Sequence, residues 1–238
     1  MKTNGFEIPE EVVRILLRDY TTNESIVWGT ASYGYDENSH IDANDIMSGK
    51  VRLKPVYREF GKDSLIPIEQ VKKDNDEMFD VTGKSSEEII CMKSFERHCN
   101  DAPHTVSLYD ESTGDIVMLP FREGLLDRKM ALINSLPLTH DETNWKVCTS
   151  NALMSSYGYE YRGDHLYMAR RNILCDVIDW YEDKFGKDIG VDMMKEFADI
   201  ISRNFVQMNE SRGCIPFTDI KTRIMKWSTG EMIELCRS

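Results

Sequence analysis

The chain has no excess of basic residues: its 238 residues include 29 lysines and arginines against 41 aspartates and glutamates, a formal net charge of -12. Neutralising DNA phosphates requires clustered lysine and arginine, so this balance argues against a free-standing DNA-binding module. Long apolar runs are also missing, and no charged-then-apolar leader follows Met1. We therefore expect a cytoplasmic protein without a membrane partner.

Several motifs of common sites are absent as well. The six cysteines include no C-x-x-C pair, and none stands near two histidines at zinc-ligand spacing, so disulfide and metal frameworks are not expected. The glycine-rich motifs of dinucleotide-binding and P-loop proteins and the G-x-S-x-G of hydrolases do not occur. His98 and Cys99 are adjacent, but neighbours on an extended chain point in opposite directions and do not form a catalytic pair.

What remains is the composition of a globular protein, 41% hydrophobic and 29% charged, in a chain long enough to bury its own core. Patterns of helix and strand recur in turn, which favours the α/β class. Helices are predicted over residues 9–19, 67–80, 125–134, 145–157 and 192–206. A buried strand is predicted over residues 25–31, and hairpins over 105–120 and 226–236.

The stretch Tyr157–Gly186 has the pattern strand, turn, helix. It predicts a short strand ending at Glu160, a tight turn at Gly163 and a long helix capped by Asp164, with an apolar stripe of Leu166, Ala169, Ile173, Val177 and Tyr181. In a doubly wound sheet, ligands bind beyond the carboxyl ends of the strands, where an acid can accept both hydroxyls of a ribose. A strand end with a solvated glutamate has the same pattern, so spacing alone leaves both interpretations open.

The segment Phe95–Asp110 carries an acid, a cysteine, an Ala-Pro pair and Ser-x-Tyr-Asp before a Thr-Gly turn: Glu96, Cys99, Ala102, Pro103, Ser107, Tyr109, Asp110, Thr113 and Gly114. Further matches follow in order at 124–129, Tyr157, Gly158, Tyr159, Glu160, Gly163, Asp164, Leu166, Ala169, Arg170, Asn172, Tyr181, Glu182, Lys184, Phe185, Gly186, Ile200, Ile201, Ser202, Asn204, Gln207, Met208, Gly213 and Pro216. With the N-terminal LLRDYTTNESIVWGTASYGY, this set resembles the small bacterial proteins called restriction endonuclease subunit M. Those are relatives of the adenine-specific DNA methyltransferases of restriction-modification systems.

The resemblance implies a Rossmann-like, S-adenosylmethionine-dependent methyltransferase fold over residues 91–238, with a helical and extended N-terminal region over residues 1–90. Glu160 would hold the ribose of S-adenosylmethionine, and Asn209 stands where the family has an aspartate that contacts the base or the cofactor amine. The methionine side would be lined by Glu96 and by the loop Cys99, Asn100, Asp101, Ala102 and Pro103.

The chain departs from the family pattern at several of these positions. Asn100 replaces a loop glycine and resists positive φ, and His104 replaces a tyrosine. Asn209 replaces the aspartate, and the Phe-Thr-Pro entry to an early helix has become Leu65-Ile66-Pro67. These changes support an alternative, in which cofactor binding is lost and the chain acts as an acidic interaction or regulatory protein.

No Asn/Asp-Pro-Pro-Tyr/Phe tetrapeptide occurs in the chain. Methylation of an adenine amine requires a flipped base whose amino hydrogens are accepted and whose ring is stacked, which that motif provides. We therefore expect no catalysis by this chain alone and a second methyltransferase subunit that carries the motif, with DNA bound through the complex. A methyltransferase that acts on another substrate through His104 or Asp127 is a third interpretation.

Overall fold

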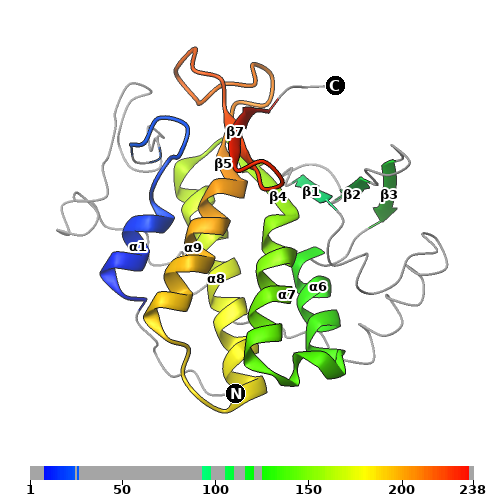
Figure 1. Cartoon of the computed structure of the whole chain (residues 1–238). Helices are drawn as coiled ribbons and strands as arrows, with labels where there is room; N and C mark the ends of the chain where they lie inside the picture. The colour runs from blue at the N-terminus through cyan, green and yellow to red at the C-terminus, as the bar shows by residue number, and fades with distance from the viewer. Residues whose placement is uncertain are drawn as a thin grey trace.

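The computed structural model describes residues 8–24, 26, 93–97, 105–109, 116–120 and 125–235, and the fold is given for these. They form a mixed α/β structure in which helices lie side by side next to a small sheet (Figure 1). The helices are α1 (Glu10–Leu16), α6 (Leu125–Ser135), the 3-10 helix η2 (Pro137–His140), α7 (Glu142–Met154), α8 (Gly163–Phe185) and α9 (Val191–Asn204). The strands are β1 (Lys93–Arg97), β2 (Thr105–Tyr109), β3 (Ile116–Pro120), β4 (Ser156–Glu160), β5 (Phe205–Gln207), β6 (Arg223–Lys226) and β7 (Glu231–Glu234).

Five of these strands form one sheet in the order β3-β2-β1-β4-β5. β2 pairs antiparallel with both β1 and β3, which confirms the hairpin predicted over residues 105–120. β1, β4 and β5 are parallel neighbours: Glu96 lies opposite Gly158, and Gly158 lies opposite Phe205. A Rossmann sheet is mostly parallel, with helical crossovers. The described sheet is parallel only over β1, β4 and β5, so the α/β class is present and the Rossmann-like architecture stays a prediction.

The strand, turn and helix predicted after Tyr157 are present as β4 and α8. The predicted cap is wrong: α8 begins at Gly163 with Arg162 as its N-cap residue, not at Asp164. The first hydrogen bond of the helix runs from the Leu166 amide to the carbonyl oxygen of Arg162, at 2.9 Å. At the other end the helix stops at a glycine with φ of 65°, which glycine adopts without a steric penalty.

The hydrophobic core lies between α7, α8 and α9. Trp145 of α7 is fully buried, and its ring meets Tyr181 of α8 edge-on at 5.4 Å and Phe197 of α9 at 6.1 Å between centroids. The Trp145 indole Nε1 donates to Asn134 Oδ1 at 2.7 Å, so the polar end of this large side chain is satisfied. Tyr181, the last residue of the apolar stripe predicted for α8, thus belongs to this core.

Two helix boundaries differ from the predictions for a common reason. The helix predicted over residues 192–206 ends at Asn204, and the one predicted over 145–157 ends at Met154. Phe205 is buried (8% exposed) and falls at the helical spacing of α9. It nevertheless belongs to β5, where it lies opposite Gly158 of β4. At both places the chain pairs with a neighbouring strand instead of forming another helical turn. The periodicity of apolar side chains does not predict this pairing.

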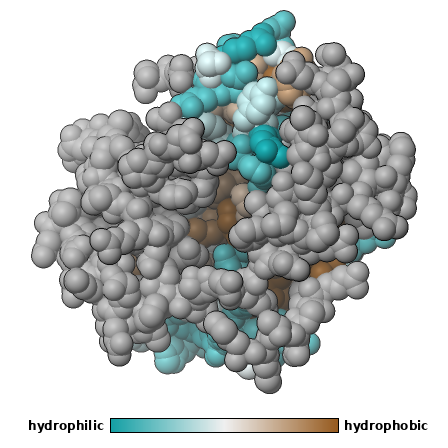
Figure 2. All heavy atoms as spheres, turned by 180° about the vertical axis from the view of Figure 1, so that it is seen from behind, coloured by the Kyte–Doolittle hydropathy of each residue, from teal (hydrophilic) through white to brown (hydrophobic). Residues whose placement is uncertain are grey.

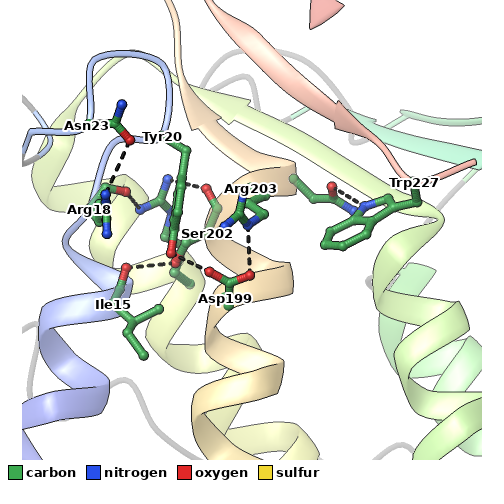
Figure 3. A network of polar contacts seen from close by, with 10 residues as sticks. Ile15, Arg18, Tyr20, Asn23, Asp199, Ser202, Arg203 and Trp227 are labelled. Carbon is green, nitrogen blue, oxygen red and sulfur yellow. Dashed lines mark hydrogen bonds and ion pairs between the residues drawn. The ribbon is translucent and has the colours of Figure 1, made fainter. Parts of the chain in front are cut away.

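The N-terminal helix α1 packs against α9. Its first residues follow Pro9, as predicted, although it ends at Leu16 and not near residue 19. Figure 3 shows contacts that join α1 and the segment after it to α9: the Tyr20 hydroxyl donates to the Asp199 carboxylate, and Ser202 Oγ donates to the Ile15 carbonyl oxygen at 3.1 Å. The predicted division near residue 90 lies outside the described residues and stays a prediction.

As the pH rises from 10.0 to about 12, the Tyr20→Phe variant is expected to lose less of its free energy of unfolding than the wild type. Burial, and after it the hydrogen bond to Asp199, raises the pKa of Tyr20 from 10.0 to about 12. Because the folded protein holds this proton more tightly than the unfolded chain, the stabilisation is complete below pH 10.0 and is lost as the pH rises through about 12. Urea unfolding at these two pH values should show a smaller decrease for Tyr20→Phe than for the wild type, and equal decreases would contradict the prediction.

Near the C-terminus, the hairpin predicted within residues 226–236 is confirmed as β6 and β7, although β6 begins earlier, at Arg223. Asn204 connects this hairpin to the core: its Oδ1 accepts from Trp227 Nε1 at 2.8 Å, and its Nδ2 donates to the Ser156 carbonyl oxygen at 3.0 Å. The helix predicted over residues 67–80 lies outside the described residues, as does the strand over 25–31 except for Ile26.

Candidate functional site

The carboxyl ends of β1, β4 and β5 meet at one edge of the sheet because these strands are parallel neighbours. Glu96 is the fourth residue of β1, Glu160 is the last residue of β4, and Asn209 comes two residues after β5. The chain leaves β1 toward the antiparallel β2 on one side and leaves β4 toward the parallel β5 on the other. In doubly wound sheets, ligands bind beyond the carboxyl ends of the strands where the strand order reverses. The strand ends at residues 96 and 160 therefore lie side by side.

The Glu160 carboxylate is held by the turn that follows it. Its Oε1 accepts from the Arg162 amide at 3.0 Å, and its Oε2 lies 3.9 Å from His165 Nδ1, with a quarter of the side chain (25%) exposed. The positive N-terminal end of α8 favours a negative charge at this place. A carboxylate has about four acceptor positions, and the Arg162 amide uses one of those of Glu160.

β5 fixes the position of this turn. The Met208 amide donates to the Glu160 carbonyl oxygen at 3.0 Å. One residue earlier, Gln207 is 1% exposed, and its Nε2 donates to the Tyr161 carbonyl oxygen at 2.9 Å. The carbonyl oxygens of Glu160 and Tyr161 are thus held by β5 and by the residue that follows it.

Asn209 forms the turn that leaves β5. Its Oδ1 accepts from the Ser211 amide at 3.1 Å and from Ser211 Oγ at 2.7 Å, and its own amide donates to the Cys214 carbonyl oxygen at 2.8 Å. The side-chain oxygen that would accept from a base or a cofactor amine therefore has two partners in its own loop. This arrangement fits a turn residue better than a ligand contact, and the predicted contact stays a prediction.

Other predicted residues lie outside the described residues or away from this edge. Cys99, Asn100, Asp101, Ala102, Pro103 and His104 are not described, although the residues that flank them, Arg97 and Thr105, pair at the carboxyl end of β1. Asp127 lies in α6. Lys129 is buried and donates to Ser155 Oγ at 2.8 Å, where the chain enters β4, which is the opposite end of that strand from Glu160.

Two aromatic residues near Glu160 were missed by the sequence interpretation. Tyr161 directly follows the acid and is 41% exposed, which is unusual for so large a side chain next to a buried strand. Its ring meets Phe217 edge-on, with 5.8 Å between centroids and 77° between planes. A tyrosine after a strand-end acid is a usable signal in the sequence, whereas the contribution of Phe217, 56 positions further along, is visible only in the fold.

The surface around this edge is polar. In the view from behind, described residues at the upper end, where the loop after β5 lies in Figure 1, are mostly hydrophilic, and hydrophobic ones gather lower down in the middle (Figure 2). Within the described ranges no group of three histidine, cysteine, aspartate or glutamate side chains is arranged to hold a metal ion.

Comparison of the chain with protein-family models, with curated proteins and with solved structures finds no match. None of the helices in the described ranges is long and apolar enough to cross a membrane.

Proposed function

We propose that the chain binds S-adenosylmethionine at the carboxyl ends of β1, β4 and β5, as the cofactor-binding subunit of a restriction-modification-type DNA adenine methyltransferase. The observation that carries this proposal is the strand order: the segments around Glu96, Glu160 and Asn209 belong to three consecutive parallel neighbours. A Rossmann-like half-sheet needs this arrangement, and the antiparallel β2 and β3 extend it on the far side of β1.

In this proposal Glu160 accepts hydrogen bonds from the two ribose hydroxyls. The carboxylate is oriented by the Arg162 amide and faces the first turn of α8, so little conformational freedom is lost on binding. Glu96 and the loop after β1 contact the methionine part. When bound, S-adenosylmethionine supplies the methyl group, while this chain holds and orients it.

In this proposal a second subunit binds the adenine base that accepts the methyl group. The tetrapeptide that accepts and stacks a flipped adenine is absent from this chain. The net charge of -12 also leaves most of the contact with DNA to a second subunit. Co-expression with the neighbouring gene products should yield a complex with methyl transfer to DNA adenine, and the chain alone should transfer none.

Titration calorimetry with the full chain tests the cofactor site. We expect the wild type to bind S-adenosylmethionine and Glu160→Gln to bind it at least about tenfold more weakly, since a neutral amide accepts hydroxyls less strongly than a carboxylate. Glu196→Gln is the matched control, because Glu196 lies on α9 and pairs with Lys146 on the surface. Wild-type protein that gives no binding heat and no thermal shift with millimolar cofactor would refute the proposal.

A second function is favoured by the loop contacts of Asn209. Because Ser211 takes up its side-chain oxygen, the site offers one acceptor fewer to a cofactor than the family pattern implies. In this alternative the fold has lost its cofactor and acts through its acidic surface as a regulatory protein of a DNA-processing complex. A stable complex with a basic partner that forms without the cofactor, in a protein that does not bind the cofactor, would select it.

A further inference from the structure

Phe217 occupies a backbone position that normally belongs to glycine. The Thr218 amide donates to the Ile215 carbonyl oxygen at 3.2 Å, which closes a four-residue turn with Pro216 in second place. Phe217 is third and has φ of 64°. This is the geometry of a type II turn, in which the third residue needs positive φ and is glycine by preference. A phenylalanine there is strained, and strained positions persist only where other contacts hold them.

The fold of the loop does not explain this choice of residue. The loop is anchored by its backbone, since the Ile215 amide bonds to the Ile220 carbonyl oxygen at 2.9 Å and Cys214 bridges to both Asn209 and Lys221. Cys214, Ile215 and Pro216 are buried, whereas Phe217 is only partly buried. A glycine would complete the same turn with less strain.

What Phe217 adds is the contact with Tyr161. The two rings meet edge-to-face, at 5.8 Å and 77°, the arrangement that aromatic quadrupoles favour. Tyr161 is the residue after Glu160, and its carbonyl oxygen is fixed by Gln207. The backbone of Tyr161 is therefore held from β5, and its ring is held by Phe217.

We infer that Phe217 is a positioning residue, which fixes the Tyr161 ring beside Glu160 so that this ring stacks on the planar base of the nucleoside whose ribose Glu160 holds. This inference rests on the proposed function and adds the part of the site that recognises the base. The mechanism is preorganisation: a ring that is already immobilised loses less rotational freedom when a base stacks on it.

Phe217→Gly separates this role from a structural one. Because glycine suits the turn, the variant should keep or raise the melting temperature of the wild type. Calorimetry should show about three- to tenfold weaker binding of S-adenosylmethionine and of adenosine, the range expected for freeing one side chain. Phe217→Tyr, which keeps an aromatic edge, should restore wild-type affinity. Ile220→Ala, at an exposed position of the same loop (48% exposed), is the control and should change neither quantity.

A double-mutant cycle adds a test that a general effect on folding would fail. In a Tyr161→Leu background, Phe217→Gly should cause no further loss of affinity, whereas its effect should add to that of Glu160→Gln. Unchanged affinity in Phe217→Gly, or a melting temperature lowered by more than about 5 °C, would overturn the role of Phe217 and leave the cofactor proposal standing. No binding of either ligand by the wild type would overturn both.

Discussion

Replacing Arg170 by methionine is expected to lower the free energy of unfolding by about 3–5 kcal/mol. Arg170 of α8 is 1% exposed and donates to four backbone carbonyl oxygens between 2.7 and 2.9 Å away: those of Leu16, Arg18, Ser202 and Phe205. Methionine fills similar space but offers no donor, so these buried acceptors would lose their partner. Urea unfolding followed by circular dichroism measures the change.

The size of this effect follows from where the four acceptors lie. Leu16 and Arg18 close helix α1, Ser202 is near the end of α9, and Phe205 begins β5, so one side chain joins three elements. Burial lowers the pKa of Arg170 to about 10, while the charge of Asp19 acts in the opposite direction. The guanidinium is thus a desolvated cation whose cost is offset by the carbonyl dipoles and by Asp19.

Two variants make the prediction specific. Arg171→Met changes the next residue of α8, which is partly exposed, and should shift the stability by no more than about 0.5 kcal/mol. Arg170→Lys keeps the charge, but a single ammonium with three donors cannot serve four carbonyls, so an intermediate loss is expected. An unfolding midpoint of Arg170→Met equal to that of the wild type would show that the network contributes nothing.

Replacing Gly158 by alanine is expected to cost about 1–3 kcal/mol through overpacking. A Cβ at Gly158 would lie 2.7 Å from Cδ1 and 2.9 Å from Cε1 of Phe205, well inside van der Waals contact. The two residues lie opposite each other on β4 and β5, and Phe205 is 8% exposed, so the ring has little room to move. The same urea measurement reports the loss.

The Phe205→Leu background identifies the clash as the cause. There the Gly158→Ala substitution should cost much less than in the wild type, and the difference between the two costs is the coupling between the residues. Equal costs in both backgrounds would place the effect in the backbone of β4. Because Gly158 lies two residues before Glu160, a displaced β4 should also weaken cofactor binding.

The central strand, turn and helix could be predicted from the sequence because each leaves a local signal. The run from Tyr157 to Glu160, the glycine at position 163 and the apolar stripe of α8 all fall within one stretch of chain, and the structure places β4 and α8 there. The end of α9 could not be predicted in this way. Phe205 fits the helical period, and only the pairing of β5 with β4 removes it from the helix.

Some residues of the candidate site could likewise be predicted from the sequence, and others only from the fold. An acid at a strand end is visible in the sequence, and Glu160 lies at the carboxyl end of β4 as predicted. The partners that position it are separated from it in the sequence: Met208 and Gln207 come from β5, and Phe217 comes from the turn beyond. The ligand contact of Asn209 stays a prediction, and in the structure its Oδ1 accepts from Ser211 Oγ within a local turn.

Within the described residues, the sequence by itself indicated where α1, α6, α7, α8, α9, β4 and the two hairpins lie along the chain, because side-chain periodicity and turn residues act between near neighbours. It did not indicate β1 or β5, nor where α7 and α9 end. It also determined the acidic charge and the absence of an adenine-binding tetrapeptide, which are properties of composition. Only the tertiary structure decided that β1, β4 and β5 are parallel neighbours, that Arg170 joins three elements, and that a strained Phe217 meets Tyr161. Those features depend on strand pairing and burial between residues far apart in the chain, which local sequence patterns do not predict.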